Sequence, residues 1–413
     1  MKSLQLDLRI PRYLFSKAVG RWWPTVYAGP LGCLRYHSDA PEPELPGPDW
    51  VKLRTVIGGV CGSDVGGVTF RHRWDTCYTR FTSFPMAMGH ENVCRVAETG
   101  PDVAGFEAGQ RVMIDPILGC APRGIDPPCR NCREGHPSTC EHFLDGPLKG
   151  TTIGNNRVTG GSWSEFFVAH KSQVHPVDDR LTDEQAVLLD PFSSAVHAVL
   201  RTGLPGDDDT VLVLGGGCMG LCTVAALRGL GFTGRLVVVG RHGKQVELAD
   251  RFGADLVLTE RGGRLWKRLA SELDARLLRS TFGFNRYLVG GAGFTYDTVC
   301  SSETMELALK CTRGQGTIGV VGMGYPRGFD FMPVWFKELT IKGCLSTGRE
   351  RWRGREVDTT DIAQELVTSG KVDITAMITH RHPIENYRQA LRECIQRGRS
   401  GQVKTVFVFG DRR

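Results

Sequence analysis

The chain has 413 residues, which is more than one hydrophobic core usually serves, so we expect two domains. Its hydrophobic content of 41%, charged content of 23% and formal net charge of +6 are those of a globular protein in water. It has no lysine-arginine block and no interleaved aromatic stripe, so we expect no nucleic-acid partner.

Cysteine use and the N-terminus bear on the cellular compartment. No apolar run approaches membrane-spanning length, and Asp7 and Pro11 interrupt the basic N-terminus where a secretory signal needs apolar residues. We therefore expect no membrane partner. A transit peptide stays open, although residues 4–8 also have the pattern of a first strand. Of the fourteen cysteines, four are clustered, which fits metal ligation and buried thiols in a cytoplasmic protein rather than a secreted disulfide scaffold.

The first 180 residues predict a mostly β domain. They are rich in Gly and Pro, with short apolar runs between turns, and we expect strands at residues 51–57, 93–98 and 111–115. The sequence pattern changes at Thr182, which forms a capping box with Gln185. This signal predicts a helix that starts there and extends to about residue 202.

Residues 190–344 predict a doubly wound parallel sheet. Strands are expected at 210–214, 235–239, 255–258, 297–300 and 317–321, and helices at 217–229, 244–252 and 303–313. Residues 260–292 interrupt this alternation as an elaboration. The pattern changes again near residue 345, so we assign residues 1–189 and 345–413 to the first domain.

Four cysteines within one loop predict a structural zinc site. Cys129 and Cys132 form a CxxC motif, Cys140 follows and Cys120 precedes it. Four thiolates suit a closed tetrahedral zinc site, which leaves no position open for substrate. Reduced thiols in a flexible loop are the alternative, and the presence of four cysteines favours zinc.

A second set of ligand-type residues predicts a catalytic zinc. Cys61 supplies a thiolate, His90 an imidazole, and Asp190 or Glu91 a carboxylate, which leaves one coordination position open. Each residue alone has a plain structural explanation as a buried thiol, a core histidine or a turn carboxylate. Their combination, each beside a Gly or Pro turn and ahead of a nucleotide-binding pattern, favours the metal.

Two neighbours of Cys61 have expected roles. Ser63 could relay the proton of an alcohol substrate outward. Asp64 is a candidate partner of His90 that would fix its tautomer.

A dinucleotide fingerprint follows. Gly215, Gly217 and Gly220, with Cys218 and Met219 between the last two, come after an apolar strand and open a helix. This is the context in which a GxGxxG motif binds a pyrophosphate at the helix N-terminus.

The end of the second strand indicates which nucleotide is bound. It carries Gly240 and Arg241, with Lys244 close by, and no carboxylate that would bind the ribose hydroxyls of NAD. Since Arg241 can pair with a 2′-phosphate, we expect NADP more than NAD. The alternative is that Arg241 stacks on adenine or faces solvent.

Together these motifs resemble the zinc-dependent medium-chain dehydrogenase/reductase superfamily, the alcohol dehydrogenase family, over nearly the whole chain. Residues 190–192 and 194–197 are most similar to the threonine, sorbitol and glucose dehydrogenase branches. Further matching segments are residues 58–64, 89–91, 160–165 and 337–339.

The resemblance implies an α/β protein with a GroES-like, mostly-β catalytic domain, a Rossmann domain, and an active site in the cleft between them. It implies homodimers or homotetramers joined through the Rossmann sheets. By the same resemblance, Cys61, His90 and the Asp190 position hold catalytic zinc, with Glu91 as an alternating ligand or close neighbour. Ser63 is the proton relay, and Cys129, Cys132 and Cys140 match three structural-zinc positions.

Three departures from the family pattern matter. The first structural cysteine would fall at Asp126, so Cys120 would have to fold back to complete the site. The distal relay histidine is replaced by Gly66, which leaves His72, another group or solvent to take the proton. The loop at 65–88 is long and aromatic, and its rings could line a substrate pocket or pack the loop onto the domain: Phe70, Trp74, Tyr78, Phe81 and Phe84.

These observations predict an enzyme with two zinc ions per chain. It would transfer a hydride between a nicotinamide cofactor and an alcohol or polyol, or an aldehyde or ketone, as small-molecule substrate. Two alternatives stay open. One is an NADPH-dependent double-bond reductase of the same fold, and the other is a nucleotide-sensing binding protein without turnover.

Overall fold

The computed structural model describes residues 1–71 and 77–410, and the chain divides into two compact units. The first unit comprises Met1–Asp190, Thr347–Arg349 and Ile378–Arg413, and the second comprises Pro191–Ser346 and Glu350–Met377. In the described residues, no helix has both the length and the apolar character needed to cross a membrane.

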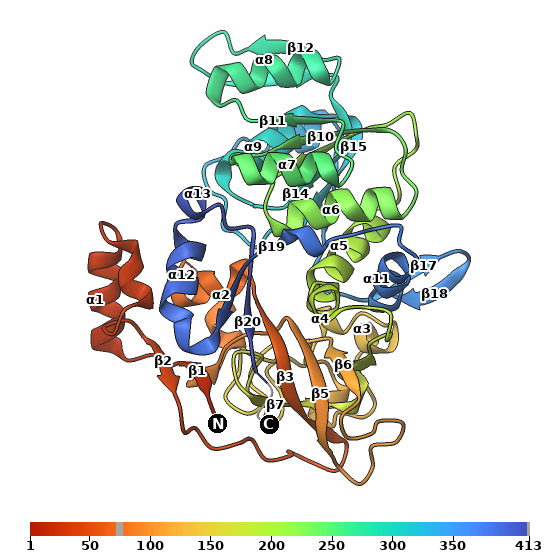
Figure 1. Ribbon diagram of the computed structural model, residues 1–413. Coiled ribbons are helices and arrows are strands. Elements are labelled where there is room, and N and C mark those ends of the chain that lie inside the picture. Colours follow the sequence, from red (N-terminus) through yellow and green to blue (C-terminus); the bar gives the residue numbers. More distant parts are fainter. Residues whose placement is uncertain (72–76, 411–413) are drawn as a thin grey trace. The chain divides into compact units, whose positions relative to one another are not determined.

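A seven-stranded, mostly antiparallel sheet forms the centre of the first unit (Figure 1). Strand β3 pairs with β5, β7 and β20, and its alternating burial places every second side chain in a core. The strands predicted at 51–57 and 93–98 fall within β3 and β5, and the strand predicted at 111–115 matches β6 except for its last residue. The strands are β3 (Trp50–Val60), β5 (Asn92–Thr99), β6 (Arg111–Ile114), β7 (Phe166–His170), β8 (Val174–Pro176), β19 (Ile378–Pro383) and β20 (Lys404–Val408).

A smaller three-stranded sheet in the order β2-β1-β4 lies in the same unit. One core cluster joins it to helices α1, α2 and α12, with Leu4, Phe70 and Leu391 among its buried members. The strands are β1 (Ser3–Leu6), β2 (Leu34–His37) and β4 (Met86–Ala87). The helices are α1 (Ile10–Gly20), α2 (Gly62–Val68), α3 (Arg130–Arg133), α4 (Asp183–Val187), α12 (Tyr387–Ile395) and α13 (Arg397–Ser400).

The second unit is built on a six-stranded parallel sheet in the order β11-β10-β9-β14-β15-β16. Helices α8 and α9 share a core cluster with strand residues such as Leu212 and Val237, and α6 and α7 lie in front of the sheet in Figure 1. The strands are β9 (Thr210–Leu214), β10 (Arg235–Val239), β11 (Leu256–Leu258), β14 (Ala292–Asp297), β15 (Thr312–Val320) and β16 (Thr340–Gly343). The helices are α5 (Leu189–Thr202), α6 (Cys218–Gly229), α7 (Gly243–Arg251), α8 (Gly262–Glu272), α9 (Ser302–Cys311), α10 (Met332–Phe336) and α11 (Thr359–Thr368).

Two element predictions need correction. The strand expected at 297–300 is wrong, because β14 ends at Asp297, whose Oδ1 accepts hydrogen bonds from the backbone N–H groups of Val299 (3.0 Å) and Cys300 (2.8 Å). The single helix expected from Thr182 is divided at Leu188 into α4 and α5. The elaboration expected at 260–292 consists of α8 and an antiparallel hairpin, β12 (Arg276–Arg279) and β13 (Arg286–Val289).

The C-terminal tail differs from the expected domain boundary, since residues 350–377 belong to the second unit. Apart from Arg349, the hairpin of β17 (Arg349–Trp352) and β18 (Arg355–Asp358) lies in this segment and is followed by α11. A side chain at Gly229 of α6 would overlap Val372, and Arg251 of α7 pairs with Asp373 at 3.0 Å. Packing against α6 and α7 therefore holds the segment in this unit.

Candidate metal and nucleotide sites

The ends of two neighbouring strands bring the first candidate metal ligands together. Cys61 follows β3 directly, and His90 and Glu91 directly precede β5. Gly58 of β3 pairs with Asn92 of β5, so the end of one strand lies beside the start of the next. The ligand atoms of Cys61, His90 and Glu91 all lie within 4.8 Å of one another.

Asp64 fixes the orientation of this cluster. Its Oδ2 accepts the backbone N–H of Cys61 at 3.0 Å, and its Oδ1 lies 3.2 Å from Nδ1 of His90. Burial acts to lower the pKa of His90, but the charges of Asp64 and Cys61 outweigh it and raise that pKa well above its usual value. With Nδ1 engaged by Asp64, Nε2 of His90 is the nitrogen available to a metal.

Glu91 has a buried counter-ion that the sequence analysis missed. Its Oε2 pairs with Nζ of Lys404 on β20, and both side chains are only 2% exposed. Gly59 makes room for the carboxylate, because a Cβ at that position would overlap Oε2 of Glu91. A lone lysine at the head of an apolar strand was the available sequence signal, and it is a weak one.

Asp190 does not join the ligand set. Among the described residues, the group within 4.8 Å comprises Cys61, His90 and Glu91 without Asp190. Burial raises the pKa of Asp190 to about 7, and the charge of His90 opposes that rise. Of the two carboxylates considered from the sequence, the geometry favours Glu91 and leaves Asp190 as a buried neighbour.

The donor set of this cluster fits zinc. A thiolate, an imidazole and a carboxylate are the side chains that zinc takes in sites with one open position. Glu91, the carboxylate of the set, already pairs with Lys404, and Asp64 holds the imidazole of His90 in place.

The four clustered cysteines also lie within 4.8 Å of one another. The Sγ atoms of Cys120 and Cys140 are 3.6 Å apart, and those of Cys129 and Cys140 are 4.0 Å apart. A zinc–sulfur distance of about 2.3 Å gives tetrahedral sulfur separations of about 3.8 Å, so the cluster has the size of a zinc site.

Cys120 reaches the cluster through a sharp turn. A 3-10 turn over Ala121–Arg123 is closed by Gly124 at φ 66°, and the backbone N–H of Cys129 then donates to Sγ of Cys120 at 3.3 Å. The buried Arg123 donates to the carbonyls of Leu118 and Asp145 at 3.0 and 2.9 Å and so fixes the loop. The fold-back expected of Cys120 is therefore present in the structure.

Crowding among the four thiols couples their ionisation. Burial opposes ionisation, but hydrogen bonds from backbone and neighbouring thiols lower the pKa of Cys129 to about 7. Burial raises the pKa of Cys132, and it raises that of Cys140 to about 11. Cys129 therefore loses its proton readily, whereas Cys132 and Cys140 stay protonated at neutral pH. A bound divalent cation would offset the negative charge that their deprotonation adds.

The nucleotide fingerprint has the expected close packing. Gly215 lies at φ 113°, and a Cβ on Gly220 would overlap the carbonyl oxygen of Gly215. Gly217 caps α6 without a side-chain hydrogen bond, and a Cβ built there meets none of the described atoms within 4 Å. The backbone at the N-terminus of α6 is thus open at Gly217, as pyrophosphate binding at a helix N-terminus requires.

The basic residues after β10 are paired with carboxylates. Arg241 forms an ion pair with Glu303, and Lys244 lies 2.5 Å from Glu247. Both pairs are largely exposed, so they contribute little to stability and a 2′-phosphate could replace either carboxylate. Gly240, which directly follows β10 in the chain, is buried.

The aromatic loop is described only in part, and the described rings pack into the first unit. Phe70 is buried, with its ring centroid 4.9 Å from that of Tyr13, and Phe81 lies 6.2 Å from Phe143. Phe84 packs on the same core as Phe70. Trp74, the Tyr78 side chain and the alternative relay His72 lie outside the described residues. Ser63 is half-buried in the first turn of α2, and Gly66 is buried in the same helix.

Comparison with protein families and known proteins shows the family of the chain. Residues 47–179 match the alcohol dehydrogenase GroES-like domain, and residues 218–361 match the zinc-binding dehydrogenase domain. The chain is 30% identical to L-threonine 3-dehydrogenase of Anaeromyxobacter dehalogenans over 366 residues, covering 88% of this chain and 93% of that one. The L-threonine 3-dehydrogenase of Rhizobium etli is also 30% identical, over 367 residues with the same coverage.

Solved structures share the fold. An alcohol dehydrogenase from Thermus sp. ATN1 superposes with a TM-score of 0.72 at 20% identity, covering 99% of each chain. Galactitol-1-phosphate dehydrogenase from Escherichia coli gives a TM-score of 0.71 at 20% identity, covering 99% of this chain and 100% of that one. The predicted α/β class, with a GroES-like and a Rossmann domain, is confirmed. The chain belongs to the zinc-dependent medium-chain dehydrogenase/reductase superfamily, the alcohol dehydrogenase family.

Proposed function

We propose that this chain is a zinc-dependent, NADP-preferring dehydrogenase that reversibly oxidises a hydroxyl group of an alcohol or polyol to a carbonyl. The observation that carries the proposal is the convergence of Cys61, His90 and Glu91 within 4.8 Å. The relatives named as L-threonine 3-dehydrogenases and the fold neighbour named as galactitol-1-phosphate dehydrogenase favour a secondary hydroxyl on a small polar substrate.

The residues around the cluster have separable roles. When bound, zinc supplies a Lewis acid and the nucleotide supplies a hydride acceptor. Asp64 holds Cys61 and His90 in place, and Lys404 balances the charge of Glu91. Ser63, in the first turn of α2, takes the proton of the substrate hydroxyl and passes it outward.

Cofactor and second-metal assignments complete the proposal. The absence of an acid after β10, together with Arg241 and Lys244, supports NADP over NAD. The sulfur separations of Cys120, Cys129 and Cys140 support a second, structural zinc.

The test is an absorbance assay of nicotinamide reduction with L-threonine and a panel of polyols, using NADP and NAD separately. We expect turnover with NADP, loss of turnover in Cys61→Ala, and turnover retained in Cys33→Ala, a matched removal of a buried thiol outside the cluster. Reduction of an enone but of no carbonyl would favour the double-bond reductase. Nucleotide binding without any turnover would favour the sensing protein.

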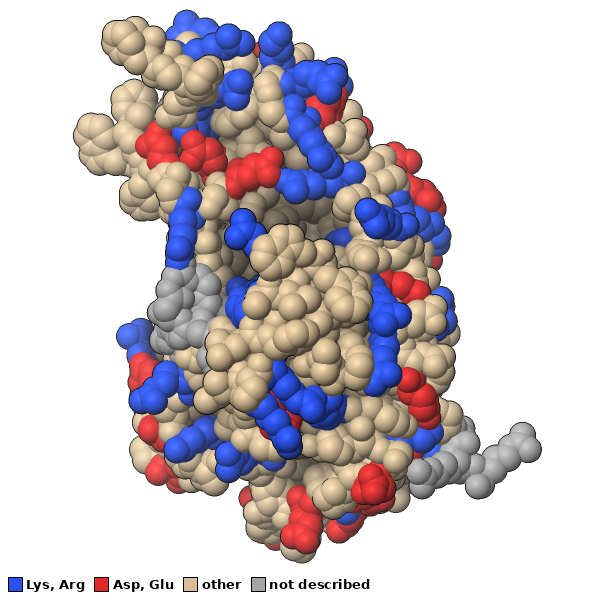
Figure 2. Space-filling view, turned by 90° about the vertical axis from the view of Figure 1, so that its left-hand side faces the viewer, with Lys and Arg blue, Asp and Glu red and all other residues tan. Residues whose placement is uncertain are grey.

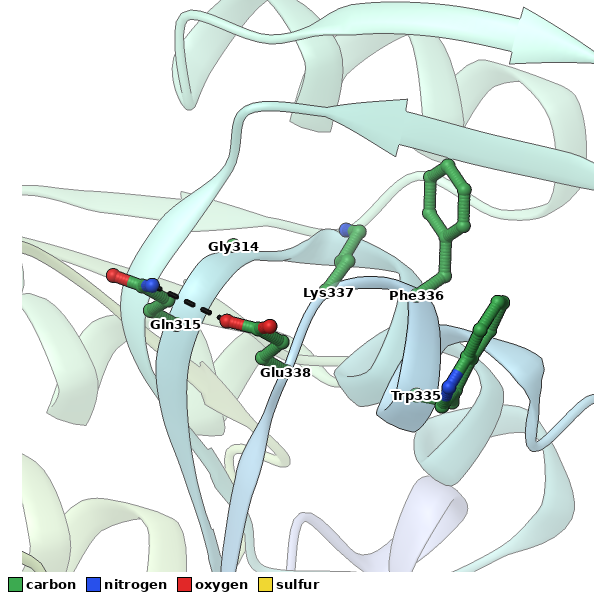
Figure 3. A pocket seen from close by; sticks show the side chains of 6 residues that line it. All are labelled: Gly314, Gln315, Trp335, Phe336, Lys337 and Glu338. Atoms are coloured by element: carbon green, nitrogen blue, oxygen red, sulfur yellow. Dashed lines mark hydrogen bonds between the residues drawn. The ribbon is translucent and has the colours of Figure 1, made fainter.

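We further propose that the chain forms homo-oligomers through its second unit. In the described part of the chain, β16 is an edge strand, and Trp335 and Phe336 of the preceding helix are 79% and 63% exposed. Figure 3 shows both rings projecting from α10 beside a hollow, across which Gln315 donates to Glu338 at 3.3 Å. An apolar edge of this kind supports strand pairing with a second copy. A monomer in sedimentation velocity would contradict it.

A further inference from the structure

A segment near the N-terminus, which we call the excursion, has an exposed apolar surface. It lies between the paired strands β1 and β2 and contains α1 and the 3-10 helix Pro24–Ala28. It precedes the residues that match the family domain, which begin at 47. The excursion is therefore a feature of this chain outside the matched dehydrogenase domains.

The inner side of α1 is firmly packed. Ser16 and Gly20 are buried, and a Cβ on Gly20 would overlap the ring of Tyr27. The Tyr13 ring stands edge-on against Phe70, and Nζ of Lys17 donates to the carbonyl of Phe70 at 2.6 Å. The outward side chains are thus presented by a fixed helix.

The outer side of α1 is apolar. At 100° per residue, the exposed side chains of Ile10, Leu14, Phe15 and Trp22 fall within an arc of about 140° opposite Ser16. Helical hydrogen bonding continues past the helix end, since the backbone N–H of Trp23 donates to the carbonyl of Val19 at 2.9 Å. An amphipathic helix in a globular protein normally buries its apolar face, whereas α1 exposes it.

Basic side chains surround this face. Residues 8–37 contain five Lys and Arg and no Asp or Glu, so they carry most of the formal net charge of +6. Figure 2 looks onto the side of the chain that carries α1 and shows an uncharged surface bordered by Lys and Arg. The members of this basic rim are Arg9, Arg12, Arg21 and Arg35, of which Arg9 also pairs with Asp7 at 2.7 Å.

We propose that α1 and Trp22–Trp23 form a docking face for an anionic phospholipid bilayer, with α1 lying in the plane of the interface. Leucine, isoleucine and phenylalanine would enter the acyl boundary, tryptophan rings prefer the headgroup level, and the basic rim faces the lipid phosphates. This is peripheral binding, and it differs from the expectation of no membrane partner, which rested on the lack of a spanning segment.

A second copy of the chain is a poorer occupant. A two-fold contact through this face would set one basic rim against another. The neighbouring acid, Asp7, already pairs with Arg9, and residues 8–37 contain no other. An anionic surface matches both the apolar face and the charge around it.

The experiment is co-sedimentation of the full chain with vesicles of phosphatidylglycerol and phosphatidylcholine, and with vesicles of phosphatidylcholine alone. We expect binding to the anionic vesicles that weakens with added salt and falls at least about tenfold in Trp22→Ser/Trp23→Ser. Arg21→Gln should weaken it by about fivefold. Phe284→Ser is the control, because Phe284 is 94% exposed and Trp22 is 81% exposed, and it should bind as wild type does.

Three outcomes would overturn the proposal. The first is failure of the wild type to bind anionic vesicles, with circular dichroism showing a folded chain. The second is equal loss of binding in Phe284→Ser. The third is a vesicle-independent oligomer that dissociates in Trp22→Ser/Trp23→Ser, which would assign the face to a second copy. None of these outcomes depends on the proposed dehydrogenase activity.

Discussion

The buried pair of Lys404 and Glu91 offers a quantitative prediction. Both side chains are 2% exposed, and Gly59 closes over the carboxylate. Lys404→Met keeps most of the side-chain volume and removes the charge. Glu91 would then lie in the interior of the first unit without its counter-ion.

The expected cost follows from burial. Removing one partner of a buried ion pair destabilises a protein by about 3–5 kcal/mol, because the remaining charge cannot regain its hydration. The same substitution at Lys171, which pairs with Asp49 at 2.5 Å with both side chains about 40% exposed, should cost less than about 1 kcal/mol. Lys404→Met/Glu91→Gln should recover most of the loss, because no uncompensated charge remains.

The assay is urea unfolding followed by circular dichroism, with chelator present so that no metal can compensate Glu91. For a denaturant dependence of about 3 kcal/mol per molar, the midpoint should fall by about 1–1.7 M in Lys404→Met. Equal midpoints for Lys404→Met and Lys171→Met would refute the account of a buried, paired carboxylate. So would a double variant that is less stable than Lys404→Met.

Three further predictions follow from the sites. Asp64→Asn should weaken zinc binding at the cluster by about 10–100-fold through loss of the carboxylate charge beside His90, measured by competition with a zinc chelator, and unchanged affinity would contradict the positioning role. Gly220→Ala should abolish nucleotide binding, measured by calorimetry, because its Cβ overlaps the Gly215 carbonyl, and wild-type affinity would show that the turn adapts. Burial lowers the pKa of Lys337 from its usual 10.5 to about 8, so unfolding takes up a proton between these pH values. Wild type should therefore gain stability relative to Lys337→Met as pH rises through this window. A difference in unfolding free energy that stays constant from pH 8 to 10.5 would contradict that burial effect.

Local signals predicted much of the fold because local hydrogen bonds decide it. The capping box of Thr182 and Gln185 is present, with Oγ1 of Thr182 accepting the N–H of Gln185 at 3.2 Å. The apolar strands around the glycine fingerprint form the parallel sheet that their composition predicted. The failure at residues 297–300 has a local cause that hydrophobicity does not reveal, since the Asp297 carboxylate takes the N–H groups that a continuing strand would use.

Long-range placement explains what the sequence could not supply. Residues 350–377 join the second unit through contacts with α6 and α7, which no periodicity in the tail encodes. At the site, Cys61 and His90 could be paired by residue type, but only the register of β3 and β5 brings them together. Lys404 was missed because its partner lies more than three hundred residues earlier in the chain.

The central claim is that the chain holds two separate zinc ions, and elemental analysis of purified protein tests it most directly. We predict about two zinc ions per chain in wild type and about one in each of Cys61→Ala and Cys132→Ala, because each variant disables a different cluster. If Cys61→Ala retains the zinc content of wild type, Cys61 is not a ligand and the proposed catalytic site is wrong.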